Sequence, residues 1–196
     1  MQKKEVLLLL TDHWADWEAA NVIAGITMAQ THDVKTISID KNPKVSIGGL
    51  RTEIDYTIEE YKNLDNLAMI ILVGGFSWGE NIYQEIADFV KKANNLNIPV
   101  AAICGATQFL AKHGFLDNAK HTGDEYEYFM EQLKDEKGYK GHANFVVSQL
   151  VNDKGFITAN ETSALEFACE ILKVLEVYPE EELAEWYKKY KNGLAN

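Results

Sequence analysis

The 196-residue sequence has few cysteines, few prolines and no long apolar run. Its two cysteines, Cys104 and Cys169, are too few for a disulfide framework or for a four-cysteine zinc site. The longest apolar runs, residues 6–10, 68–73 and 98–104, fall far short of the roughly 18 residues that a membrane-spanning helix needs. The first run is also too short for the core of a signal peptide, so we expect a cytoplasmic protein with reduced thiols and no membrane partner.

Basic residues are scarce as well. Lys and Arg number 19 against 30 Asp and Glu, which leaves a formal net charge of −11 with histidine neutral. This balance argues against nucleic acid as a partner, because nucleic acid is a polyanion. Apolar residues make up 46% and charged residues 25%, which is typical of a globular protein rather than a disordered chain. With three prolines, no linker-like segment and no repeat, we expect one domain over residues 1–196.

Short apolar runs alternate with helical patterns along the chain. The runs are residues 6–10, 34–39, 68–73 and 99–104. Continuous apolar runs are typical of parallel strands that are buried on both faces, and the alternation in 34–39 suits a strand nearer an edge. Apolar residues recur at helical spacing after Asp16, over 82–93 and over 165–175, with Asp16 as the expected N-cap of the first helix. This order predicts an α/β fold with a central, mostly parallel sheet and helices on both faces.

Three further segments are expected to add smaller elements. Gly48-Gly49 within residues 45–57 predicts a small hairpin, and residues 144–159 predict two more strands joined by a turn at 152–155. The segment 179–194 is expected to form an amphipathic C-terminal helix. Its apolar face comprises Leu183, Trp186, Tyr187, Tyr190 and Leu194.

Chemically useful residues follow three of the apolar runs. Because ligands bind beyond the carboxyl ends of the strands in an open α/β sheet, we expect these residues to converge. Glu18 follows the first run, the pair Gly74-Gly75 follows the third, and Cys104 with Gly105 ends the fourth. Trp14, Trp17 and Trp78 fall at the same edge, where they could line a pocket or lie in a subunit contact.

Cys104 lies between a predicted strand and a predicted helix, among small residues. This is the pattern of a nucleophile elbow, and a helix N-terminus would lower the pKa of the thiol. The alternative is a buried apolar cysteine at the end of a core strand. Cys169 lies on the apolar face of a predicted helix and is expected to pack in the core.

The other candidates each have two interpretations. Gly74-Gly75 could orient backbone N–H groups toward an oxyanion or simply form a tight turn. Glu18 could hydrogen-bond the sulfur of Cys104 or act only as a carboxylate at a helix N-terminus. His121, in the loop 117–122, could assist the thiol as a general base or be a solvated loop histidine.

Four segments together resemble the ThiJ/PfpI family. They are residues 98–117 around the cysteine (IPVAAICGATQFLAKHGFLD), 69–75 (MIILVGG), 15–18 (ADWE) and 158–167 (TANETSALEF). The resemblance extends to about Val177. It implies membership of the class I glutamine amidotransferase-like superfamily, a flavodoxin-like three-layer α/β/α sandwich and a homodimer, with no metal or organic cofactor.

The resemblance also implies roles for residues. Cys104 would be the reactive thiol, Glu18 the carboxyl bonded to it, and Gly75 and Gly105 the donors of oxyanion-binding N–H groups. Two positions depart from the family's pattern. Gly105 stands where peptidase-like members have histidine, and the loop reads Lys120-His121-Thr122 where many members have a histidine after a Thr pair. Both departures weaken the peptidase interpretation.

Family members range from peptidases and glyoxalase- or deglycase-like enzymes to chaperones, isonitrile hydratases and redox sensors, so the fold does not decide the activity. We expect a cysteine-dependent enzyme of the hydrolase, glyoxalase or deglycase type that acts on a small carbonyl or amide substrate. The alternatives are a non-catalytic stress or redox-sensing protein that oxidises Cys104, an intracellular cysteine peptidase, and a binding module with an inactive site.

Overall fold

The computed structural model describes residues 3–79, 83–134 and 139–194. A seven-stranded sheet with the order β5-β2-β1-β6-β7-β9-β8 lies at its centre. The strands of this sheet are β1 (Glu5–Leu9), β2 (Asp33–Ser38), β5 (Tyr56–Thr57), β6 (Leu67–Leu72), β7 (Val100–Ile103), β8 (Leu150–Asp153) and β9 (Phe156–Ala159). All neighbouring strands are parallel except β8 and β9, which are antiparallel. The mostly parallel sheet expected from the sequence is confirmed.

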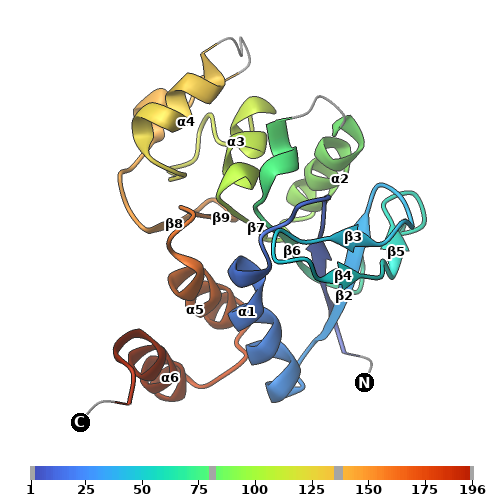
Figure 1. Ribbon diagram of the computed structural model, residues 1–196, viewed down its shortest axis with the longest axis vertical. Helices are drawn as coiled ribbons and strands as arrows, with labels where there is room; N and C mark the ends of the chain where they lie inside the picture. Colours follow the sequence, from blue (N-terminus) through green and yellow to red (C-terminus); the bar gives the residue numbers. More distant parts are fainter. Residues whose placement is uncertain (1–2, 80–82, 135–138, 195–196) are drawn as a thin grey trace.

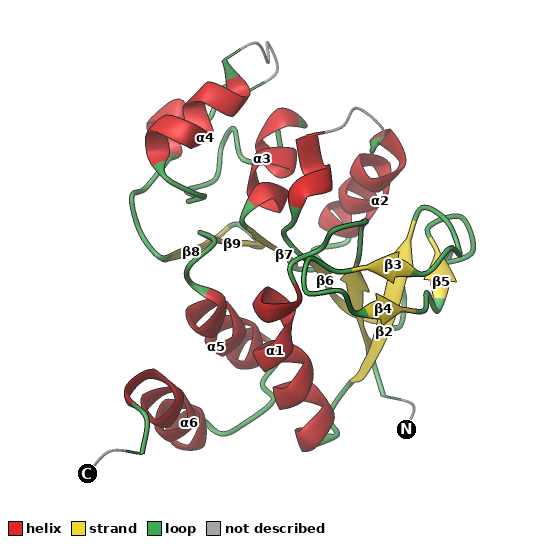
Figure 2. Cartoon of the chain, in the orientation of Figure 1, coloured by secondary structure: helices red, strands yellow, loops and turns green. Residues whose placement is uncertain are grey.

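Helices cover both faces of the sheet, so the molecule is a three-layer α/β/α sandwich (Figure 1). The helices are α1 (Asp16–Ala29), α2 (Gln84–Asn95), α3 (Gly105–Lys112), α4 (Tyr126–Leu133), α5 (Ala164–Val174) and α6 (Glu180–Asn192). Figure 2 shows α2, α3 and α4 on one side of the sheet and α1, α5 and α6 on the other. None of the described helices is long and apolar enough to cross a membrane.

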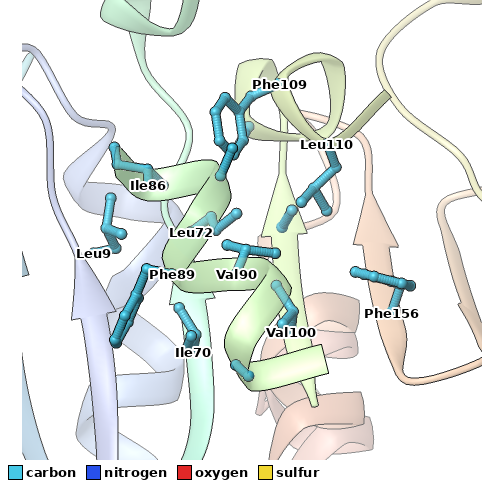
Figure 3. Packing of buried hydrophobic residues seen from close by; sticks show 14 of the residues in the cluster. Leu9, Ile70, Leu72, Ile86, Phe89, Val90, Val100, Phe109, Leu110 and Phe156 are labelled. Carbon is cyan, nitrogen blue, oxygen red and sulfur yellow. The ribbon is translucent and has the colours of Figure 1, made fainter. Parts of the chain in front are cut away.

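The two helical layers bury opposite faces of the same strands. Leu7 and Leu9 of β1 belong to a core cluster with α2 and α3, whereas Val6 and Leu8 belong to a second cluster with α1 and α5. Side chains alternate between the faces of a strand, so a strand buried on both faces must be apolar at every position. Figure 3 shows the first cluster, in which Phe89 of α2 packs against the sheet. This double burial explains why the strands appear as continuous apolar runs in the sequence.

The smaller elements agree with the sequence in kind and differ in detail. The hairpin pairs β3 (Lys44–Val45) with β4 (Arg51–Thr52), and the later strand pair begins at Leu150 rather than near residue 144. Ile82, at the start of the second expected helix, lies outside the described residues. Leu183 of α6 packs into the second core cluster, but Leu194 lies beyond the end of this helix and is exposed.

Asp16 is not the N-cap of α1, which is Ala15. Its carboxylate instead accepts hydrogen bonds from Ser46 Oγ at 2.5 Å and from the Gly48 N–H at 3.1 Å. The side chain that local sequence assigns to a helix end is therefore used to hold the β3–β4 hairpin against α1. The N-cap prediction was wrong because a partner about thirty residues away competes for the same carboxylate.

Candidate active site

Cys104 lies at a sharp corner between β7 and α3. It is the N-cap of α3 and has φ 55° and ψ −134°, a strained conformation for a residue with a side chain. The neighbouring residue must be small, because a Cβ on Gly105 would lie 3.0 Å from the carbonyl oxygen of Gly75. This geometry is that of a nucleophile elbow, as the sequence predicted.

Glu18 projects from the first turn of α1 toward this corner and is fully buried. Its Oε2 accepts a hydrogen bond from the Gly74 N–H at 2.9 Å. Its Oε1 is buried without a conventional N–H or O–H partner among the described residues, and the side chain beside this carboxyl is the thiol of Cys104. Glu18 is thus not simply a solvated carboxylate at a helix end.

Burial changes the protonation of this pair. It raises the pKa of Glu18 to about 8, against which the hydrogen bond from Gly74 acts only partly. Glu18 is therefore mostly protonated at neutral pH, and its proton is available to the sulfur. Burial also raises the pKa of the Cys104 thiol, and the nearby carboxyls of Glu18 and Asp124 raise it further. The expectation that the helix N-terminus would lower this pKa was wrong, because burial outweighs the favourable N–H of Gly105.

Two acidic residues that sequence reasoning missed complete the surroundings of the thiol. Asp124 is only 8% exposed, interacts with Cys104 and accepts a hydrogen bond from the Glu161 N–H at 3.0 Å. The Cys104 sulfur and one carboxylate oxygen each of Asp124 and Glu161 lie within 4.8 Å of one another. Within the described ranges this is the one group of side chains with the composition to hold a metal ion. Burial raises the pKa of Asp124 to about 6.

Both missed residues had a signal in the sequence. Glu161 follows β9, so it lies at the same carboxyl-end edge as Cys104. Asp124 lies three residues after His121, just beyond the loop 117–122 in which a partner for the thiol was sought. The sequence indicated the loop, but the path of its backbone decided which side chain reaches the sulfur.

His121 does not take the role expected of it. The side chain is fully buried, and its two ring nitrogens are hydrogen-bonded to the Ala119 carbonyl and the Tyr139 hydroxyl, each at 2.8 Å. Burial lowers the pKa of His121, so the ring is neutral at pH 7. Since both nitrogens are hydrogen-bonded to Ala119 and Tyr139, we expect His121 to hold the loop and not to assist the thiol.

The predicted oxyanion glycines lie at the elbow. Gly75 has φ 147°, and a Cβ there would lie 2.4 Å from the His13 carbonyl oxygen. The backbones that follow β1 and β6 therefore approach closely at Gly75, and a Cβ on Gly105, after β7, would lie 3.0 Å from the Gly75 carbonyl oxygen. The tryptophans are placed differently from one another. Trp14 and Trp78 are 5% and 3% exposed and pack in the two core clusters, so they do not form the walls of an open pocket.

A cavity of about 410 Å³ adjoins the acidic side of the elbow. Its lining includes Asp124 and Glu161 together with Tyr126, Phe145 and Val147. The cavity is large enough for a small organic molecule and lies beside the thiol's acidic neighbours. Cys104 itself is not among the residues that line this cavity, and Asp124 and Glu161 are the residues that the cavity shares with the surroundings of the thiol.

Comparisons with known proteins agree with this geometry. Residues 4–174 match the model of the DJ-1/PfpI family. The chain is 41% identical over 176 residues to "Uncharacterized protease YdeA" of Bacillus subtilis (strain 168). This match covers 88% of this chain and 84% of that protein. It is also 35% identical over 198 residues to "Uncharacterized protease YoaZ" of the same organism, covering 97% and 92% of the two chains.

Solved structures give the same result. The thiJ/pfpI family protein from Bacillus anthracis superposes with a TM-score of 0.88 at 33% identity, over 98% of this chain and 92% of that one. The DJ-1 superfamily protein Atu0886 from Agrobacterium tumefaciens superposes with a TM-score of 0.84 at 26% identity, over 95% and 99% of the two chains. By sequence over residues 4–174 and by structure, the chain belongs to the DJ-1/PfpI family.

Proposed function

We propose that this protein is a cysteine-dependent enzyme of the hydrolase, glyoxalase or deglycase type that acts on a small carbonyl or amide compound. The observation that carries the proposal is the strained elbow that presents Cys104 to both Glu18 and Asp124. Strained backbone of this kind is kept where the surrounding structure holds it, typically at functional sites. The reduced thiol that the chemistry needs is stable in a reducing compartment such as the cytoplasm.

Each neighbour of the thiol has a role in the proposed reaction. Asp124 is mostly ionised at pH 7 and accepts the thiol proton as the sulfur attacks. Glu18, which is mostly neutral, holds the sulfur by a hydrogen bond and adds no negative charge. The N–H groups of Gly75 and Gly105 stabilise the developing oxyanion. In this scheme a carboxylate performs the task that a histidine performs in a standard Cys-His dyad.

Peptides form a second substrate class in the proposal, because the two relatives from Bacillus subtilis are named as proteases. Redox sensing is less well supported by the charges at the site. Oxidation of Cys104 to a sulfinate would add a negative charge beside Asp124 and Glu161, within 4.8 Å of their carboxylate oxygens. We therefore favour catalysis over redox sensing as the role of Cys104.

The test compares wild type with Cys104→Ala and Asp124→Asn on a panel of small aldehydes, amides and peptides. We expect Cys104→Ala to abolish turnover and to keep the wild-type fold by circular dichroism. Asp124→Asn should lower kcat by about 100-fold or more, which is the typical contribution of a positioned general base. Full activity of the alanine variant would rule out the nucleophile.

A further inference from the structure

We propose that the β3–β4 hairpin positions the candidate active site through Asp16, which makes Asp16 a positioning residue for Glu18 and Cys104. The hairpin holds the loop between β1 and α1, and this loop holds Gly74, whose N–H restrains the carboxyl of Glu18. The inference rests on the function proposed above and adds a residue to its site. Three observations support it: a continuous set of backbone hydrogen bonds, a strained residue within that set, and a carboxylate that ties it to α1.

The loop between β1 and α1 lies against the hairpin (Figure 1). The His13 N–H donates a hydrogen bond to the Val45 carbonyl at 2.8 Å. The Ile47 N–H donates to the Trp14 carbonyl at 2.9 Å. Trp14 in turn forms an isolated antiparallel bridge with Gly75, so this part of the loop lies between the hairpin and the glycine pair. A movement of the hairpin would therefore be passed to the loop.

The same loop is bonded to the segment that follows β6. The Ala15 N–H donates to the Gly74 carbonyl at 2.9 Å, and the Phe76 N–H donates to the His13 carbonyl at 3.2 Å. The N–H of Gly74 then donates to Oε2 of Glu18 at 2.9 Å. A movement of the loop would therefore displace the donor that restrains Glu18 beside the thiol.

His13 shows that the loop is held in place rather than relaxed. Its φ of 56° lies in the left-handed region, which is uncommon for a residue with a side chain. A Cβ on Gly75 would lie 2.4 Å from the His13 carbonyl oxygen, so the two backbones are in close contact. Strained residues persist only where the surrounding structure fixes them. We therefore expect the loop to relax away from the glycine pair when the hairpin is loosened.

Asp16 ties the hairpin to the first turn of α1, the turn that also carries Glu18. Its Oδ2 accepts hydrogen bonds from the Oγ of the buried Ser46 at 2.5 Å and from the Gly48 N–H at 3.1 Å. A Cβ on Gly48 would lie 2.1 Å from this oxygen, so the hairpin backbone lies directly against the carboxylate. One helical turn thus holds the hairpin with one carboxylate and borders the elbow with the other.

The direction of the effect follows from the Gly74 N–H, which favours the ionised form of Glu18. Its loss should raise the pKa of this carboxyl further. Loss of the negative charge of Asp16 would by itself lower the same pKa, so the two causes have opposite signs. The titratable groups that act on Glu18 are the thiol of Cys104 and the carboxyls of Asp124 and Glu161, and the variants below leave all of them in place.

Two variants loosen the hairpin from opposite sides. Asp16→Ala removes the acceptor, whereas Gly48→Ala displaces the carboxylate and leaves the sequence of α1 unchanged. Lys44 still ties the hairpin in both variants, because its Nζ lies 3.1 Å from Asp40 Oδ1 and 3.7 Å from Asp12 Oδ2. We therefore expect both proteins to fold.

Asp55→Ala is the matched control. The carboxylate of Asp55 accepts hydrogen bonds from the N–H and the hydroxyl of Thr36, at 2.8 and 3.1 Å, so it loses the same two kinds of donor as Asp16 does. Thr36 lies in β2, three strands from β7 in the sheet. Asp16→Asn is the conservative variant, because it keeps an oxygen acceptor for the hairpin.

The first measurement is the pH dependence of Cys104 alkylation by iodoacetamide, followed by peptide mass spectrometry. The inflection near pH 8 is assigned to Glu18 by its loss in Glu18→Gln. We expect it to move to higher pH by about half a unit or more in Asp16→Ala and in Gly48→Ala. Asp16→Asn should restore most of the wild-type position, and Asp55→Ala should leave the inflection where it is.

The second measurement follows the backbone directly. Amide hydrogen exchange of Gly74 and Phe76, observed by NMR, should become about tenfold faster or more in the two loosened variants, because their acceptors are Glu18 and the loop. Cys169 is partly buried on α5 and serves as the reference for unfolding. Its rate of alkylation should stay as in wild type.

Four results would overturn the inference. They are an unchanged inflection in both loosened variants, a shift to lower pH, an equal shift in Asp55→Ala, and a wild-type profile without the Glu18 inflection. A shift to lower pH would mean that charge or water, and not the Gly74 N–H, carries the effect. Because neither measurement requires turnover, the expected shifts in a protein that turns over no substrate would contradict the proposed function alone. An active enzyme without these shifts would contradict the inference alone.

Discussion

The carboxyl of Glu18 and the side chain of Cys104 both border the space that a Cβ on Gly74 would occupy. A Cβ on Gly74 would lie 2.3 Å from Glu18 Oε2 and 2.7 Å from Cys104 Cβ. The absence of a side chain at this position is therefore what allows the two groups to meet. Because both groups titrate and interact, their apparent pKa values belong to the pair.

Substitution of Glu18 tests whether its proton is shared with the sulfur. In Glu18→Leu the donor is lost, so near pH 7, where Glu18 of the wild type is protonated, we expect alkylation of Cys104 to slow by about tenfold or more if the bond is worth about 1.5 kcal/mol. Above pH 8, where the ionised carboxylate of the wild type raises the pKa of the thiol, the variant should instead react faster than wild type. Glu18→Gln keeps a donor that cannot ionise, so Cys104 should stay reactive at neutral pH. The measurement is the pH dependence of alkylation by iodoacetamide. A leucine variant with the wild-type profile would mean that the carboxyl does not act on the thiol.

The buried Glu18 should also make stability depend on pH. Its pKa in the folded state, about 8, lies above the ordinary glutamate value of 4.5, so its stabilising contribution is complete below about pH 4.5 and is lost as the pH rises through 8. Between about pH 6.5 and 8.5 we expect wild type to lose about 2 kcal/mol of unfolding free energy through this group. Urea denaturation at both pH values should show a smaller loss in Glu18→Gln. Equal losses in the two proteins would contradict a raised pKa.

His121 is expected to matter for stability and not for the thiol. His121→Phe removes both ring nitrogens and leaves the Tyr139 hydroxyl without its partner, which should cost about 1–3 kcal/mol of unfolding free energy. The pH profile of Cys104 alkylation should stay as in wild type. Tyr139→Phe, which removes the other partner of the same hydrogen bond, is the matched control. A large change in thiol reactivity in a folded His121→Phe protein would show that His121 acts on the thiol.

We also expect a homodimer in solution. Two aromatic side chains at the carboxyl-end edge of the sheet, Trp17 and Phe76, are 49% and 77% exposed, and aromatic residues are enriched in subunit contacts. Sedimentation equilibrium at micromolar concentration should give twice the chain mass of 22.1 kDa. In Trp17→Ala the dimer should weaken. A wild-type mass equal to that of one chain would exclude the dimer at this concentration.

The sequence by itself determined the layered fold and the position of Cys104 at the strand–helix corner. Strands that are buried on both faces must be apolar at every position, so β1, β6 and β7 are visible as runs without any knowledge of their partners. The small residues around Cys104 likewise reflect a local requirement, because the backbone at the elbow is crowded. Requirements of this kind act on residues that are adjacent in the chain, so they can be recognised from the sequence alone.

Only the tertiary structure decided which acidic side chains beyond Glu18 surround the Cys104 thiol. Asp124 and Glu161 reach Cys104 from two separate segments that no spacing along the chain relates to it, whereas Glu18 was expected there from the sequence. The choice of Asp124 over His121 depends on a loop path set by distant hydrogen bonds, such as that from the Thr122 N–H to the Thr158 hydroxyl. The rise in the thiol's pKa had the same origin, because burial is a property of the assembled layers. The local sequence placed the thiol at a helix N-terminus, where partial positive charge would lower its pKa. Only the packed structure shows that burial and the nearby carboxyls raise this pKa by more.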